Sequence, residues 1–280
     1  MPTYNRADFI EDTIRSVQNQ SYPNWELIII DDGSADNTPE IVRQINDKRI
    51  RYHHFIHSGM EHARNTGLQK TKGQLIAFLD SDDLWSPNKL QEQVNYFAVN
   101  NQVAFCLTGG YEFESPGHPL VFYYKQKTGA SHGNLFVPFF QSKLVAATSS
   151  LLFRRQCLDT VAFREQTELA HIHFILGLTM HFEGVILYEH LSFRRLHQSN
   201  YSKINSRKRH YDGIDLIKRY KNFIPHNVFT DALLKSHVNY GENCLGRNEK
   251  FVAIMEFIRA WKYQPFNIVP FKKIAKTIVS

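Results

Sequence analysis

Apolar and polar positions follow two different patterns over the first hundred residues of the chain. Short runs rich in apolar residues predict strands at residues 25–30, 49–55 and 74–80. Between and after these runs, apolar residues recur every three or four positions, which predicts helices over residues 9–17, 38–45, 60–73 and 86–97. Strands and helices that alternate in this way form βαβ units with right-handed crossovers. The pattern therefore predicts an α/β fold, a Rossmann-like α/β/α sandwich around a mostly parallel sheet.

Local signals support this assignment. The stretch WELIII at residues 25–30 ends in consecutive apolar residues, as in a strand buried on both faces of a parallel sheet. Thr38 before Pro39 and Ser86 before Pro87 are typical helix starts, because a hydroxyl side chain caps the helix and Pro fits its first position. Two helices are therefore expected to begin at these positions.

The second half of the chain carries a weaker pattern. Residues 109–133 are rich in Gly, Pro and aromatic residues and predict either a long connection or a hairpin. From residue 207 onward the spacing is helical, with a turn at residues 246–248 and a helix that ends before Pro265. The helix pair resembles one tetratricopeptide-like hairpin, but a solenoid needs about three repeats, so a helical appendage is expected. The predicted organisation is a domain over residues 1–202, with halves 1–105 and 106–202, followed by a basic helical region over residues 203–280.

Composition places the chain among ordinary globular proteins. Hydrophobic residues make up 42% and charged residues 21% of its 280 positions. The three cysteines are odd in number and far apart, which favours a reducing, cytoplasmic location. The sequence has neither a long apolar run nor the basic and then apolar start of a signal peptide. Nothing in this pattern predicts a membrane span.

Positive charge gathers at the end of the chain. Residues 203–280 hold 15 Lys or Arg against 6 Asp or Glu, whereas residues 1–202 hold 18 against 21. Such a region either contacts anionic lipid at the inner face of a membrane or forms a solvated helical surface. The solvated surface is the simpler interpretation, and the basic ending PFKKIAKTIVS is the segment that would make a peripheral membrane contact. No basic motif with interleaved aromatic residues is present, so no nucleic acid partner is expected.

Two acidic clusters follow predicted strands directly, DDGS at residues 31–34 and DSDD at residues 80–83. Ligands of open α/β sheets bind beyond the carboxyl ends of the strands, where the two clusters would meet. Carboxylates so near to each other repel unless a cation compensates their negative charge. Mg²⁺ typically binds one or two carboxylates together with substrate phosphates. The pair therefore points to a diphosphate ligand, although either cluster alone is also typical of a simple turn.

Six segments together resemble the family 2 glycosyltransferases: PTYNR, LIIIDDGSADNT, ARNTGL, KGQLIAFLDSDDLWSPNKL, SSLLFRR and FRRLHQSNYS. The resemblance is dense up to about residue 100 and thinner over residues 145–202. It implies the GT-A fold and the transfer of a sugar from a nucleotide diphosphate donor to an acceptor hydroxyl, with inversion at the anomeric carbon. It also implies Mn²⁺ or Mg²⁺ as cofactor and a carbohydrate or lipid-linked acceptor, as in polysaccharide or glycolipid synthesis.

The resemblance assigns several residues to the nucleotide sugar. They lie on the first loop, the first acidic cluster and the ARN helix: Pro2, Thr3, Tyr4, Arg6, Asp31, Asp32 and Arg64. Either Asp31 or Asp32 corresponds to the family carboxylate that hydrogen-bonds the base. Arg64 corresponds to a residue near the ribose or the diphosphate.

The second acidic cluster carries the metal-binding assignment. Asp80 and Asp82 match the family's DxD pair, with Asp82 expected to contact the metal and Asp80 to contact the ribose or a metal-bound water. Asp83 adjoins them as support. His197 matches a family histidine that approaches the metal or the diphosphate, but with 14 histidines in the chain an ordinary core or surface role is an equal alternative.

The general base is where the sequence departs from the family. The stretch FREQTELAHIHFILGL aligns without a gap and puts His171 and Ile172 at the family's Glu-Asp pair. Isoleucine cannot accept a proton, whereas His171 can, and Glu168 one helical turn earlier would share its face. Either these two residues supply the base, or the protein binds nucleotide sugars without transferring them.

The resemblance also implies a buried strand before PTYNR, and this chain starts at the Met that precedes the loop. We therefore expect the first strand to be missing, because the start was assigned to an internal Met or the gene is truncated. Backbone groups left buried and unpaired cost about 1–3 kcal/mol each, so the chain as written is expected to be poorly stable.

Overall fold

The structure, a computed structural model, divides into two compact units. It describes residues 1–124, 127–145, 147–163, 169–200 and 206–279. The first, here the α/β unit, comprises Met1–Leu135, Val145–Gln166 and Ala170–Asn200. The second, here the helical unit, comprises Phe136–Leu144, Thr167–Leu169 and Tyr201–Ser280.

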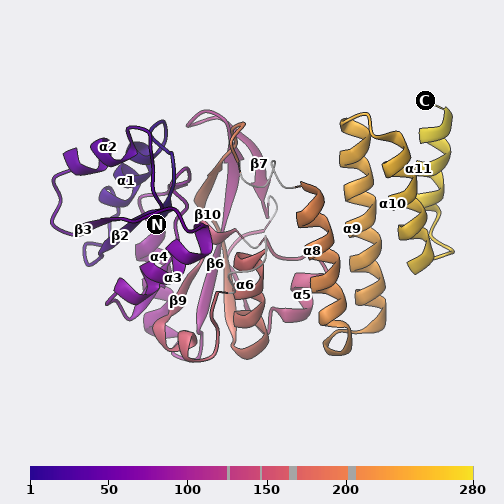
Figure 1. Ribbon diagram of the computed structural model, residues 1–280. Coiled ribbons are helices and arrows are strands. Elements are labelled where there is room, and N and C mark those ends of the chain that lie inside the picture. The colour runs from indigo at the N-terminus through magenta and orange to yellow at the C-terminus, as the bar shows by residue number, and fades with distance from the viewer. Residues whose placement is uncertain (125–126, 146, 164–168, 201–205, 280) are drawn as a thin grey trace. The chain divides into compact units, whose positions relative to one another are not determined.

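The first sheet of the α/β unit is parallel throughout (Figure 1). Its strands run in the order β1 (Pro2–Thr3), β2 (Leu27–Asp31) and β3 (Ile50–His54). Pro2 pairs with Ile30 and Leu27 with Ile50, so the three carboxyl ends meet at one edge. The strands predicted from WELIII and RIRYHHF are thus confirmed, and the loop predicted at Pro2 begins with two residues of strand.

Strand β2 is buried on both faces, as its apolar sequence predicts. Ile29 packs in one core cluster with α1 (Ile10–Gln18), whereas Ile30 packs with Ala63 of α3 (Met60–Lys70) on the other face. Successive side chains of a strand point to opposite faces, so a strand between two helical layers needs apolar residues at every position. The sandwich predicted from the sequence follows from this burial.

A second sheet runs through the middle of the α/β unit. Its main path is β4 (Leu75–Ala77), β9 (Leu152–Arg154), β6 (Phe105–Phe113), β10 (Gly184–Arg195) and β5 (Leu84–Trp85). The long strands β6 and β10 are parallel to each other. The short strands β5, β7 (Pro119–Tyr123), β8 (Ala130–Gly133) and β9 pair antiparallel with them. Residues 109–133 therefore form a hairpin and a further edge strand, so the predicted alternative of a long connection is wrong.

Helices α4 (Lys89–Val99) and α6 (Ala170–His181) flank this sheet. Phe97 of α4 shares a core cluster with Cys106 and Leu152, and the ring of Phe174 on α6 lies 5.2 Å from that of Phe153. These contacts bury both faces of the central strands. The hydrophobic spacing of the sequence therefore selects the correct inward faces.

Two predicted helix starts are displaced. Helix α2 (Thr38–Gln44) has Asn37 at its N-cap, and the Thr38 hydroxyl instead accepts the backbone N–H of Arg6. Helix α4 begins only at Lys89, whose N–H donates to the Ser86 carbonyl in a preceding turn. The hydroxyl of Thr38 is thus used in a tertiary contact, and Ser86 lies in a turn that precedes its helix.

A cavity separates the two sheets. No hydrogen-bonded pairing joins β2 to β4 among the described residues, and a cavity of about 550 Å³ lies between them, lined by residues of both strands and by Met1. The Met1 ammonium donates a hydrogen bond to the Ile28 carbonyl at 2.9 Å, and burial lowers the pKa of this amino group to about 5.

The helical unit contains α5 (Phe136–Phe140), α8 (Ser206–Arg219), α9 (His226–Gly246), α10 (Lys250–Tyr263) and α11 (Ile268–Val279). Helices α9, α10 and α11 lie side by side (Figure 1). Gly241 allows the ring of Phe257 to approach so closely that a Cβ atom would lie 2.5 Å from it. The predicted helix, turn and helix that ends before Pro265 are confirmed. Within the described part of the chain, no helix is long and apolar enough to cross a membrane.

Candidate active site

The two acidic clusters lie where their strands predict, at the carboxyl ends of β2 and just after β4. A third segment joins them, because residues after β10 fold back against the second cluster. His197 Nε2 lies 3.0 Å from Asp82 Oδ2, and Arg6 Nε donates to the same oxygen at 3.3 Å. The first loop, the DSDD loop and the end of β10 thus converge on one carboxylate.

Asp82 is held as an anion by its neighbours. Burial alone would raise the pKa of Asp82, but the hydrogen bond from His197 and the charge of Arg6 outweigh it and lower the pKa. Only Oδ2 accepts hydrogen bonds from other described side chains, which leaves Oδ1 with unused lone pairs. The side chain as a whole is 14% exposed.

Asp80 and Asp83 differ although both adjoin Asp82. Asp80 is one-third exposed, and its Oδ1 accepts a hydrogen bond from Arg64 Nη2 at 2.9 Å. Asp83 is buried, with Oδ2 accepting from the Ser149 hydroxyl at 2.6 Å and Oδ1 from the Arg195 N–H at 3.1 Å. Burial and then the charge of Asp82 raise the pKa of Asp83 well above its usual range. Asp83 therefore anchors the loop, whereas Asp80 and Asp82 face outward.

The first acidic cluster organises two loops. Asp31 is fully buried, and its oxygens accept the Ser34 N–H and the Tyr52 hydroxyl. Asp32 instead accepts the backbone N–H groups of Ser58 and Gly59, at 2.7 and 2.8 Å, and so fixes the loop before α3. Of the two carboxylates, only Asp32 borders the loop that carries exposed side chains.

Tyr4 and His57 form an aromatic platform beside Asp32. Their ring centroids lie 4.4 Å apart in a stacked arrangement, and His57 Nδ1 lies 2.8 Å from Asp32 Oδ2. Tyr4 is 42% exposed. Asn5, next to it, adopts a positive φ of 49° while its amide oxygen accepts the Ala35 N–H. The loop PTYNR is therefore fixed by backbone contacts to the acidic cluster.

Arg64 lies at the boundary between the site and the cavity. Its guanidinium binds Asp80 on one side, yet its Nε and Nη1 are buried without a hydrogen-bond partner among the described residues. The Oγ1 atom of Thr3 is in the same situation. Arg64 also lines the cavity beside Met1. Glu61 Oε1 lies 3.5 Å from Nη1 and compensates its charge, so Arg64 Nε and Thr3 Oγ1 are the atoms left here without a polar partner among the described residues.

Of the two candidate base residues, the structure describes only His171. His171 lies half-buried in the first turn of α6, next to Ile172. Glu168 lies outside the described residues, so its pairing with His171 stays a prediction.

Sequence reasoning missed three residues that build the site. Arg195 is buried and donates to the Asp82 carbonyl and to Asp12 Oδ2, both at 3.0 Å. Ser149 binds Asp83 and accepts the Asp80 N–H, and His57 forms the platform. The segments SSLLFRR and FRRLHQSNYS signalled the first two, but no spacing rule singles out individual residues in them.

Solved structures with the same architecture identify the fold. S. aureus TarS 1-349 in complex with UDP-GlcNAc superposes with a TM-score of 0.63 at 15% identity, covering 99% of this chain and 87% of that chain. The mannosyltransferase PcManGT from Pyrobaculum calidifontis, in complex with GDP-Man and Mn²⁺, gives 0.61 at 17% identity, covering 99% and 78%. The fold is that of the GT-A glycosyltransferases, as the sequence predicts.

The sequence itself matches Glycosyl transferase family 2 over residues 1–156, more than half of the chain. The chain belongs to this family. A Bacillus subtilis glycosyltransferase named for teichuronic acid biosynthesis, TuaG, is 43% identical over 125 residues, which cover 42% of this chain and 48% of the relative. Escherichia coli WfgD, a UDP-Glc:alpha-D-GlcNAc-diphosphoundecaprenol beta-1,3-glucosyltransferase, is 44% identical over 113 residues, covering 40% and 44%. The alignments thus span half or less of these relatives' lengths.

Proposed function

We propose that this protein transfers a sugar from a nucleotide diphosphate donor to an acceptor hydroxyl with inversion, with a divalent cation bound at Asp82. The convergence of Arg6 and His197 on Asp82 carries the proposal, because it joins three family motifs into one anionic site with outward-facing oxygens. Membership of glycosyl transferase family 2 supports the reaction class.

The base of the nucleotide is proposed to lie on the platform of Tyr4 and His57. Stacked aromatic rings beside a carboxylate offer one flat apolar surface and one hydrogen-bond acceptor, which suits a nucleobase. Asp32 is the proposed carboxylate because it contacts His57 of the platform, whereas Asp31 is fully buried and binds Ser34 and Tyr52. Of the two alternatives left by the sequence, we therefore propose Asp32.

Asp80, Asp82 and His197 would hold Mn²⁺ or Mg²⁺. The fit rests on oxygens of both carboxylates that accept no hydrogen bond from other described residues. A bound cation would stabilise the charge that develops on the departing diphosphate. Arg6 lies beside Asp82 and adds a positive charge there. The contact between Asp83 and Arg195 fixes the loop that carries Asp82.

His171 is the proposed general base, with Glu168 as its proposed partner. The opening turn of α6 carries both His171 and Ile172, which occupy the family's acidic pair. An imidazole that titrates near neutrality can take the acceptor's proton. Ile172 at the second position supports one competing function, nucleotide-sugar binding without transfer.

The acceptor is proposed to be a carbohydrate or a lipid-linked saccharide. WfgD, by its name, acts on a diphosphoundecaprenol-linked sugar, and TuaG is named for a cell-wall polymer. A peripheral contact with the cytoplasmic face of a membrane would bring such an acceptor within reach. Helix α11 supports it, because Phe271 and Ile278 are exposed beside Lys272 and Lys276.

Calorimetric titration of UDP, GDP and dTDP in the presence of Mn²⁺ tests the proposal. We expect one of the three to bind and the binding to be lost in Asp82→Asn. Asp159→Asn, an exposed residue of the same unit, makes the same chemical change away from the site and should bind as the unaltered chain does. Absence of binding by all three nucleotides would refute a working nucleotide site.

A further inference from the structure

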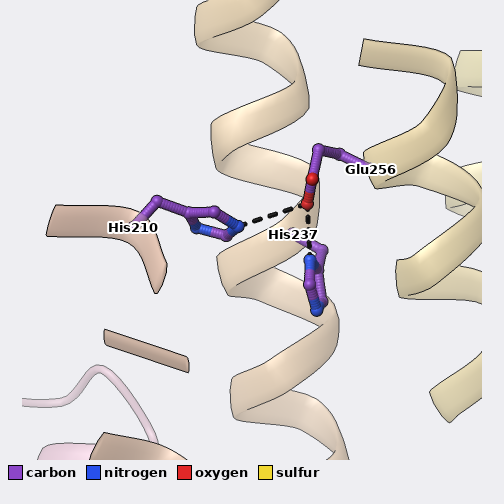
Figure 2. Close-up of side chains that lie close together, drawn as sticks. All are labelled: His210, His237 and Glu256. Carbon is purple, nitrogen blue, oxygen red and sulfur yellow. Dashed lines mark hydrogen bonds and ion pairs between the residues drawn. The ribbon is translucent and has the colours of Figure 1, made fainter. Parts of the chain in front are cut away.

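Three polar side chains meet in the interior of the helical unit. His210 comes from α8, His237 from α9 and Glu256 from α10, and Figure 2 shows both rings directed at one carboxylate. Glu256 Oε2 lies 3.2 Å from His210 Nε2 and 2.6 Å from His237 Nδ1. All three ligand atoms lie within 4.8 Å of one another.

Each side chain of this cluster is withdrawn from solvent. The side chain of Glu256 is 0% exposed, and those of His210 and His237 are 4% and 5% exposed. Buried ionisable groups normally require a strong partner, because desolvation disfavours the charged form. Two imidazoles that share one oxygen of a buried carboxylate are also the donor set of a transition-metal site.

The two carboxylate oxygens of Glu256 bind different partners. Arg259 Nη1 and the Tyr211 hydroxyl both bind Oε1, the latter at 3.1 Å. Oε2 is left to face the two imidazoles. Partners that orient a carboxylate through its second oxygen are typical around metal ligands.

The two rings are also fixed from behind. His210 stacks on Tyr240 with centroids 4.2 Å apart, and its Nδ1 lies 3.4 Å from the Ser236 hydroxyl. His237 stacks on Tyr263 at 5.8 Å. Each ring therefore presents one defined nitrogen to Oε2, Nε2 in His210 and Nδ1 in His237.

We propose that His210 Nε2, His237 Nδ1 and Glu256 Oε2 bind a zinc ion that ties α8, α9 and α10 together. Zinc takes His nitrogen and carboxylate oxygen at about 2.0–2.2 Å, so tetrahedral ligand atoms lie about 3.3 Å apart. The separation from His210 Nε2 to Oε2 already has this value, and His237 has to withdraw by less than about 1 Å. A water molecule completes the coordination. The ion is structural, since it links three helices that are separate in sequence.

Zinc titration of the chelator-treated full chain against a competing colorimetric chelator tests this site. We expect one zinc per chain, with a dissociation constant at least tenfold higher in His237→Gln, which keeps a hydrogen-bonding amide but loses the nitrogen ligand. His226→Gln, on the same helix and exposed, should bind zinc unchanged. Asp82→Asn should also keep this zinc, which separates it from the proposed active-site cation.

A second measurement needs no variant. Co²⁺ added to the chelator-treated chain should give the intense visible absorption of four-coordinate cobalt, and zinc should abolish it. Zinc should also raise the thermal midpoint of unfolding. If no zinc binds to the unaltered chain, or His237→Gln binds it as tightly, the cluster is an ion-paired core and the proposal is wrong.

Discussion

His197 Nε2 lies 3.0 Å from Asp82 Oδ2, although 115 residues separate the two in sequence. Phe9 holds the imidazole from the other side, with ring centroids 4.4 Å apart. The contact therefore closes the end of β10 onto the DSDD loop. It places His197 beside the proposed cation. A role at the cation and the role of an ordinary surface histidine therefore predict different effects when His197 is replaced.

Replacing His197 by Gln should weaken Mn²⁺-dependent nucleotide binding by about 10- to 100-fold, the usual effect of losing a group that orients a metal site. Calorimetry with the nucleotide that binds best measures the loss. His190 lies on β10, the strand before His197, and is exposed, so His190→Gln should bind normally. Equal affinity in both variants would assign His197 to packing alone.

Lys89 provides a prediction about pH. The side chain is fully buried, its Nζ donates to Gln93 Oε1 at 2.7 Å, and burial lowers its pKa to about 7. The unfolded chain takes up the proton already near pH 10, whereas the folded chain does so only near pH 7. Lys89 therefore lowers the free energy of unfolding progressively as pH falls from about 10 to 7.

Lys89→Met should remove this penalty. Each unit of pKa shift corresponds to about 1.4 kcal/mol, so the variant should be more stable at pH 7 by about 2–4 kcal/mol, after allowance for the lost contact with Gln93. The gain should shrink as pH rises toward 9. Urea unfolding at pH 7, 8 and 9 measures it, with the exposed Lys48→Met as the control. A gain that is independent of pH would contradict this explanation.

The sequence predicts the first sheet well because local patterns decide it. The run LIII has to be buried on both faces, and Ile29 and Ile30 indeed face opposite helices. The helical spacing of residues around Phe97 likewise selects its inward face. The positions of the acidic clusters are predicted equally well, because each cluster follows its strand directly in the sequence.

What the sequence does not predict depends on long-range contacts. Arg195 reaches Asp12 and the Asp82 carbonyl across more than a hundred residues, and no period or motif encodes that meeting. The His210, His237 and Glu256 cluster has irregular spacing, so it emerges only when three helices pack. The cap at Thr38 fails because its hydroxyl is recruited by Arg6, a tertiary contact that overrides a local preference.

The cavity between β2 and β4 predicts that an added strand would stabilise the chain. A segment of alternating Val and Ile residues placed before Met1 could pair with both strands, fill part of the 550 Å³ and offer a carbonyl to Arg64 Nε. It would also remove the buried ammonium whose pKa is lowered to about 5. We expect a higher thermal midpoint of unfolding than for the original chain.

A Gly and Ser extension of equal length is the matched control for this test. It removes the same ammonium but offers no apolar surface and little strand preference. A stabilisation by the Val and Ile segment alone would show that the cavity accepts a strand. Equal midpoints for both extensions would show that the cavity is not a strand site.

Helix α11 predicts binding to anionic lipid. Phe266, just before the helix, is fully exposed, and Phe271 on the helix is mostly exposed beside Lys272. Changing both to Ser should reduce partitioning onto phosphatidylglycerol vesicles by at least about tenfold, because each buried aromatic contributes about 1.5–3 kcal/mol. Phe251→Ser, equally exposed on α10, is the control. Sedimentation at low and high salt measures the binding, and no vesicle binding by the unaltered chain would refute the membrane contact.

His171 decides between transfer and binding alone. If its imidazole removes the acceptor proton, His171→Gln should lower kcat by about 10²- to 10⁴-fold while the affinity for the nucleotide stays the same. The acid limb of the pH profile of kcat should disappear with it, which loss of a purely structural group would not cause. His173→Gln, two residues along the same helix, tests for disturbance of α6 itself.

Release of nucleotide from UDP-glucose, UDP-GlcNAc and GDP-mannose, with and without saccharide acceptors, provides the assay. Full activity in His171→Gln would place the base elsewhere. Tight nucleotide binding with no turnover by the unaltered chain would favour the competing function, in which Ile172 marks a site that binds nucleotide sugars and no longer transfers them.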